Sequence, residues 1–145
     1  MNIFTIGFTG KTAEKFFGLL SNSHATKLID IRINRTSQLA GFAKEQDLKY
    51  FLPKLIGMEY LVREDLAPTK ELLASYRNSE IDWSAFAKSY SDLIVSRKAL
   101  ENSDLLEFSN AVLLCSESEP DKCHRTLLTN LLTERNSNFK IINLF

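Results

Sequence analysis

Apolar and polar positions follow two different periods along the chain. Five short runs are rich in apolar, β-prone residues and predict strands, at positions 2–8, 26–32, 58–64, 110–115 and 139–145. Longer stretches carry apolar residues at helical spacing, at positions 12–22, 45–57 and 119–135, and the middle region, residues 68–108, divides into helical segments at 69–77, 82–100 and 102–108. The chain is therefore expected to alternate strand and helix from end to end.

Individual residues mark where these helices begin and end. Thr12 and Asp82 are suitable N-caps, and Gly57 is a suitable helix stop. Pro53 lies within an apolar helical pattern, so that helix is expected to be short or kinked. The last helix is expected to begin near Pro120, with acidic residues in its first turn.

Apolar strands that alternate with helices predict one fold class. Such strands form a mostly parallel sheet that is buried on both faces, and right-handed crossovers place helices on each side. Neither a repeat nor a linker divides the sequence. We therefore expect a single α/β domain over residues 1–145, a Rossmann-like three-layer α/β/α sandwich with about five strands.

Composition narrows the classes of partner. Eighteen basic and eighteen acidic residues cancel in a chain of 145, which disfavours binding to nucleic acid or an anionic membrane by bulk charge. A local basic face remains open as an alternative, made of Arg32, Arg35, Lys44, Lys49 and Lys54. Because we find neither a signal peptide nor a membrane-spanning run, we expect a cytoplasmic protein that does not act at membranes.

Polar residues follow three of the predicted strands. The first strand ends near Gly7 and Thr9, the second at Asp30 and Arg32, and the fourth at Cys115. In a parallel sheet these carboxyl ends meet at one edge, where ligands of such folds bind. The sequence therefore predicts a site at this edge, although the stretch from Gly7 is too short for a known phosphate-binding loop.

Asp30 and Arg32 lie two residues apart, on the same side of a strand. Arg32 could hold an anion through two parallel hydrogen bonds, and Asp30 could accept a proton or orient a substrate. A structural ion pair between the two side chains is an equal alternative. Both interpretations remain open.

The stretch from Cys115 to Arg125 contains both cysteines of the chain. A metal site would have at most three ligands here, and adjacent Cys123 and His124 on a helix would point apart, so no metal is predicted. A nucleophilic or redox role is possible because a helix N-terminus lowers the pKa of a thiol. However, nine residues separate Cys115 from Arg125, which does not match the C-x5-R loop of phosphatases. Two buried, unreactive cysteines are the third alternative.

His124 and Arg125 would lie in the first turn of the last helix, where positive charge opposes the helix dipole. A bound anion would compensate for that charge and would use the free N–H groups of the helix end. Nearby acidic side chains such as Glu117 could also compensate. We therefore rank Arg32 and Arg125, with Thr9, as candidate ligand-binding residues.

These motifs together resemble a known family. "TIGFT", "DIR", "GMEY" and "LLCSESEPDKCHR" are similar to the motifs of the bacterial and archaeal domain-of-unknown-function family 488. The resemblance implies an α/β fold and a shared site, and it implies no established reaction. Phe8 stands where that family usually has histidine, and Arg35 stands where proline is usual, so a mechanism that needs two imidazoles is in doubt here.

The sequence thus favours an enzyme-like domain that binds an anionic ligand at the carboxyl edge of its sheet. The ligand would be a nucleotide, a nucleic-acid segment or a phosphorylated small molecule. Candidate catalytic residues are Asp30, Glu117, His124 and Cys115. The alternatives are a non-catalytic module for nucleic acid or protein and a Cys/His metal or redox site. The sequence leaves the cofactor and the oligomeric state unknown.

Overall fold

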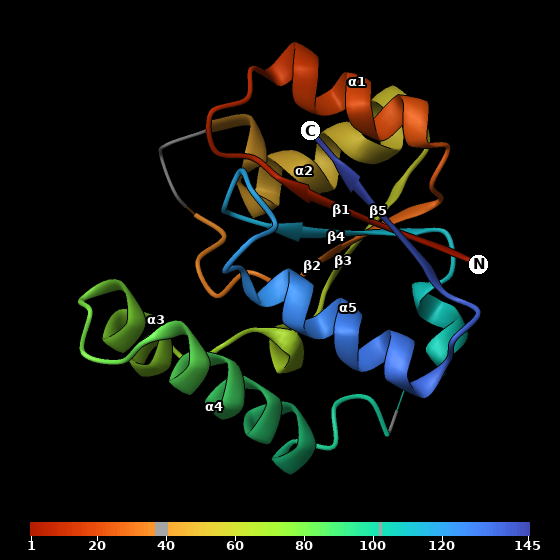
Figure 1. Ribbon diagram of the computed structural model, residues 1–145. Helices are drawn as coiled ribbons and strands as arrows, with labels where there is room; N and C mark the ends of the chain where they lie inside the picture. Colours follow the sequence, from red (N-terminus) through yellow and green to blue (C-terminus); the bar gives the residue numbers. More distant parts are fainter. Residues whose placement is uncertain (37–40, 102) are drawn as a thin grey trace.

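The computed structural model describes residues 1–36, 41–101 and 103–145 (Figure 1). The strands are β1 (Asn2–Gly7), β2 (Lys27–Asp30), β3 (Glu59–Val62), β4 (Ala111–Cys115) and β5 (Lys140–Leu144). The helices are α1 (Ala13–Ser23), α2 (Glu45–Phe51), α3 (Lys70–Arg77), α4 (Trp83–Ser96) and α5 (His124–Arg135). The predicted alternation of strands and helices is confirmed.

The strands form one sheet in the order β3-β2-β4-β1-β5, and every pairing is parallel. Their carboxyl ends therefore share one edge, and the loops after β1, β2 and β4 gather there (Figure 1). Gly7 at the end of β1 lies opposite Cys115 at the end of β4. This register places the predicted polar residues side by side, and the expected α/β class is confirmed.

Successive side chains of each strand face opposite sides of the sheet, and each side has its own core. On one side, Phe4 and Ile6 of β1 pack with buried residues of α1 and α2, such as Phe16 and Leu48. On the other side, Leu113 of β4 and its neighbours pack with α4 and α5. Figure 1 shows the resulting three layers, with α1 and α2 above the sheet and α3, α4 and α5 below.

Several predicted helix boundaries are confirmed. The side chains of Thr12 and Asp82 accept hydrogen bonds from backbone N–H groups in the first turns of α1 and α4. The segment with Pro53 continues α2 as a π-helical turn, Leu52–Ile56, which ends at Gly57 with φ +66°. None of the described helices is long and apolar enough to cross a membrane.

The predicted start of the last helix near Pro120 is wrong, whereas the prediction that His124 and Arg125 lie in its first turn is confirmed. Pro120 and its acidic neighbours lie in a turn, and α5 begins at His124. Lys122 adopts φ +53°, a left-handed conformation that cannot continue a right-handed helix. Thr126 Oγ1 instead donates to the carbonyl of Pro120 at 2.7 Å and ties this turn to α5.

The two main helices predicted for the middle region, residues 69–77 and 82–100, are confirmed as α3 and α4, which are separated by residues 78–82. The described part of the third predicted segment, residues 103–108, contains only a short 3-10 turn at Leu105–Phe108. Ser79 and Lys98 have positive φ values, so the chain turns where a helix would have to continue. Asn102, which also falls within this prediction, lies outside the described residues.

Gly7 is packed against the loop that follows β4. A Cβ atom at this position would lie 1.6 Å from the carbonyl oxygen of Glu117 and 2.7 Å from Nη1 of Arg125. No side chain can occupy that space without displacing backbone. The space that a side chain at this position would need is therefore filled by the protein's own loop.

We expect Gly7→Ala to destabilise the fold by about 1–3 kcal/mol or more, because the added methyl group must displace the loop after β4. Urea unfolding measures the change. Gly18→Ala in α1 is the matched control, since a Cβ atom there meets nothing within 4 Å. It should be neutral or stabilise by about 0.5–1 kcal/mol. Equal stability of Gly7→Ala and the wild type would contradict the packing described here.

Candidate functional site

A cavity of about 320 Å³ lies at the carboxyl edge of the sheet. Five of the seven predicted site residues line it, namely Thr9, Arg32, Cys115, Glu117 and His124. They come from the ends of β1, β2 and β4 and from the start of α5. The helix after β1 covers one face of the sheet and the helix after β4 covers the other, so the loops diverge here. Such a divergence is where parallel α/β folds place ligands.

Cys115 and His124 form a close pair within this site. Nδ1 of His124 lies 3.6 Å from Sγ of Cys115, and Nε2 donates to the carbonyl oxygen of Ile31 at 2.9 Å. The bond to Ile31 keeps a proton on Nε2, which leaves Nδ1 facing the sulfur. The arrangement is that of a thiol beside its own base.

The surroundings of Cys115 favour its thiolate form. Burial alone raises the pKa of the thiol. The hydrogen bond from Cys123, the charge on His124 and the Glu117 backbone N–H outweigh burial, so the pKa of Cys115 falls well below its ordinary value. Burial lowers the pKa of His124, but the charge and hydrogen bonding of Cys115 raise it overall. Both shifts favour the thiolate of Cys115 and the imidazolium of His124.

Cys123 completes the cluster. It occupies the N-cap position of α5 without capping the helix, and its Sγ donates to Sγ of Cys115 at 2.9 Å. This bond to Cys115 and then burial raise the pKa of Cys123, so it remains a neutral thiol. The expectation that Cys123 and His124 would point apart is wrong, because Cys123 precedes the helix and both side chains face Cys115.

Cys115, Cys123 and His124 could supply three ligands to a metal, since their ligand atoms all lie within 4.8 Å of one another. Two thiolates on one tetrahedral zinc lie about 3.8 Å apart, given Zn–S bonds of about 2.3 Å. The two sulfur atoms here are 2.9 Å apart, closer than two thiolates on one zinc ion would lie. The absence of a metal stays a prediction.

Asp30 and Arg32 form the ion pair that was one of the two sequence alternatives. Nε and Nη2 of Arg32 donate to the two oxygens of Asp30 at 2.9 and 2.7 Å, and the Tyr60 hydroxyl donates to Oδ2 of Asp30 at 2.5 Å. Both members of the pair are buried, and Phe8 packs under the guanidinium at 5.3 Å. Asp30 does not line the cavity, whereas Arg32 does.

Arg125 lies behind the cavity instead of lining it. It is 1 % exposed, and its two terminal nitrogens donate to the carbonyls of Glu117 and Ser118 at 2.9 and 3.2 Å. Within the part of the chain that the structure describes, its Nε is buried without a partner. The guanidinium therefore holds the loop between β4 and α5, and its predicted ligand contact stays a prediction.

The structure adds residues that the sequence did not single out. Arg77, in the last turn of α3, lines the cavity and donates to Glu117 Oε1 at 3.2 Å. Leu73 of the same helix also lines it. Each looks like an ordinary residue of an amphipathic helix, so no local signal identifies it. The carbonyl of Ile31, which orients His124, carries no side-chain signal either.

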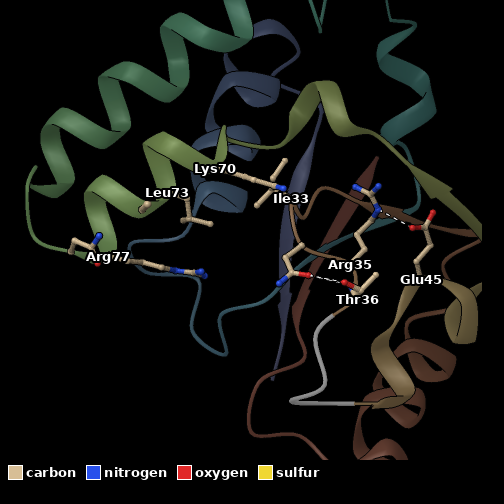
Figure 2. Close-up of a pocket in the computed structure, with 10 residues that line it drawn as sticks. Ile33, Arg35, Thr36, Glu45, Lys70, Leu73 and Arg77 are labelled. Atoms are coloured by element: carbon tan, nitrogen blue, oxygen red, sulfur yellow. Dashed lines mark hydrogen bonds and ion pairs between the residues drawn. The ribbon is translucent and has the colours of Figure 1, made fainter.

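A larger cavity, of about 560 Å³, adjoins the first and shares Ile33, Asn34, Leu73 and Arg77 with it. Figure 2 shows Lys70, Leu73 and Arg77 on one side of this cavity, with Arg35 and Glu45 opposite. Arg35 binds Glu45 and Glu64, and Arg32 is buried. Of the basic face considered from the sequence, Arg35 is thus neutralised by ion pairs and Arg32 is buried.

Comparison with known families covers the site motifs from Asp30 to Arg125. The family described as domain of unknown function DUF488 matches residues 12–132. The chain belongs to the DUF488 family. This match confirms the resemblance seen in the sequence and runs from residue 12, just before α1, to residue 132 within α5, so it includes Cys115, Cys123 and His124. Searches of curated proteins and of solved structures gave no match.

At neutral pH, we expect the wild-type DUF488 protein to absorb more ultraviolet light than Cys115→Ser does. The difference between the two spectra is the absorbance of the Cys115 thiolate. It should be lost as pH falls through the lowered pKa of Cys115, with a midpoint below the ordinary value of about 8.5. His124→Gln removes the positive charge and should raise this midpoint by about one unit or more. A wild-type midpoint at or above the ordinary value would contradict the ion pair.

We expect Arg125→Ala to lower the free energy of unfolding by about 2–4 kcal/mol, because it removes two hydrogen bonds and leaves a buried cavity. Arg135→Ala is the matched control on the same helix, where the side chain is exposed. That change should stay within about 0.5 kcal/mol. If urea unfolding shows equal stability for both variants, Arg125 does not hold the loop.

Proposed function

We propose that this DUF488 domain is an enzyme in which the Cys115 thiolate attacks a small electrophilic substrate bound at the carboxyl edge of the sheet. The single observation that carries the proposal is the Cys115–His124 contact of 3.6 Å inside the wall of a cavity. His124 would then donate its Nδ1 proton to the leaving group. A thiolate is the form of cysteine that acts as a nucleophile.

An acidic group on the substrate fits the charges around the cavity. Arg32 and Arg77 both line it and present guanidinium groups, with Thr9 on the same wall. Among the described residues, Nη1 of Arg32 donates to no protein acceptor, so it is available to an anion. Glu117 is already bound to Arg77, which limits its repulsion of an anion.

In this proposal some of the predicted residues contact the substrate and others hold those residues in position. Cys115 is the nucleophile and His124 the proton donor, while Arg32 and Thr9 bind the substrate. Asp30 orients Arg32 through two hydrogen bonds, and Arg125 positions the loop. A small molecule suits the cavity of about 320 Å³ better than a nucleic-acid segment, because Arg32 is 2 % exposed.

The test compares alkylation of Cys115 by iodoacetate, an anion, with alkylation by neutral iodoacetamide. If the cavity attracts anions, the ratio of the two rates should exceed the ratio for a free thiol in solution. Arg77→Gln should lower this ratio about fivefold, the effect of one charge about 4 Å away in water. Peptide mass analysis after each reaction identifies the alkylated cysteine.

Arg135→Gln is the control for net charge, since Arg135 lies at the far end of α5 and is exposed. It should leave the ratio unchanged. No alkylation of Cys115 in the folded protein would overturn the nucleophile. If Cys115 is alkylated but its iodoacetate-to-iodoacetamide rate ratio equals that of a free thiol, Cys115 remains the proposed nucleophile. The proposed preference for anionic substrates would then be wrong.

A further inference from the structure

The site contains two cysteine sulfur atoms, but the proposed nucleophilic attack uses only that of Cys115. The role of Cys123 is therefore unexplained. Sγ of Cys123 lies 2.9 Å from Sγ of Cys115, about 1 Å beyond the length of a disulfide bond. Both side chains are 2 % exposed, so solvent does not compete for this contact. The chain has no other cysteine, so a disulfide bond within one molecule can form only between these two residues.

The loop between the cysteines is fixed at several points. The backbone N–H of Thr9 donates to the carbonyl of Ser116 at 3.1 Å, and Arg125 holds the next two carbonyls. Thr126 holds the carbonyl of Pro120 at the other end of the loop. The contact between the sulfur atoms is thus supported by hydrogen bonds at both ends of the loop.

The two sulfurs face different spaces. Cys115 lines the cavity of about 320 Å³ that also contains Thr9 and Arg32. Cys123 lines a second cavity of about 310 Å³, which adjoins the first and shares Leu73, Arg77, Glu117 and His124 with it. Because Cys123 does not line the first cavity, a substrate bound there meets Cys115 first.

We propose that Cys115 and Cys123 are a reversible dithiol–disulfide pair that reduces a small, negatively charged disulfide bound in the first cavity. This inference rests on the proposed function, because it uses Cys115 as the nucleophile. It extends the proposed function in two ways: the substrate is a disulfide, and Cys123 reacts in the second step.

The chemistry takes place in two exchanges. The Cys115 thiolate attacks one sulfur of the substrate R–S–S–R, a mixed disulfide forms, and the departing thiolate takes a proton from His124. Cys123 then attacks Sγ of Cys115, the Cys115–Cys123 bond forms, and the second RS⁻ leaves with the proton of Cys123. The substrate gains two electrons and two protons and yields two RSH, and the two cysteines are oxidised to one disulfide.

Dithiodiglycolate is a suitable probe, because it is a compact disulfide with a carboxylate on each arm. The reduced protein is incubated with it without oxygen, quenched with acid, alkylated in denaturant and digested with trypsin. Cleavage after Lys98, Lys122 and Arg125 separates the Cys115 peptide, residues 99–122, from the Cys123 peptide, residues 123–125. A Cys115–Cys123 disulfide appears as these two peptides joined.

We expect the joined peptides from the wild type. Cys123→Ser should instead accumulate the Cys115 peptide carrying one thioglycolate, because the first exchange proceeds and the second cannot. Cys115→Ser should leave Cys123 unmodified or slow its modification by about tenfold or more, since a neutral buried thiol reacts poorly. Circular dichroism of each variant confirms that it is folded before the reaction.

Three other results would overturn the inference. A wild-type protein that stops at the mixed disulfide on Cys115 shows that Cys123 does not react, and the proposed function survives. Alkylation by iodoacetate without any reaction with dithiodiglycolate keeps the nucleophile and removes the disulfide substrate. Failure of both reagents at Cys115 removes the proposed function together with the inference.

Discussion

The site depends on one buried contact, between the Arg125 guanidinium and the loop that joins β4 to α5. The terminal nitrogens of Arg125 hold two successive carbonyls of that loop, and Gly7 leaves the space into which the first carbonyl fits. This contact fixes the position of α5 relative to β4, and with it the distance between Cys115 and His124. A longer side chain at Gly7 or a shorter one at Arg125 would separate them.

Burial has opposite effects on the members of the Cys115–His124 pair. Removal from water alone would keep both groups neutral, by raising the pKa of the thiol and lowering that of the imidazole. Their mutual attraction, with the hydrogen bond from Cys123, reverses both tendencies. A charge pair in a low-dielectric surrounding is strong as long as both members are present, so each residue stabilises the reactive form of the other.

Phe8 lies next to the site, at the position where the resemblance of the TIGFT motif to its family implies histidine. Here an aromatic ring packs beneath Arg32. The ring supports the guanidinium by a cation–π contact and brings no proton to the cavity. The acid–base chemistry proposed here accordingly uses a single imidazole, that of His124, which is oriented by the carbonyl of Ile31.

The sequence by itself determined the parallel α/β fold, the N-caps Thr12 and Asp82, and the edge at which five of the seven candidate residues gather. These features depend on local patterns and on the direction of strands, which residue spacing encodes. Only the tertiary structure decided that Cys123 turns toward Cys115, that Arg125 serves the loop, and that Arg77 reaches the cavity from α3. Each of these depends on where one element packs against another, because a side chain finds its partner through space and not along the chain.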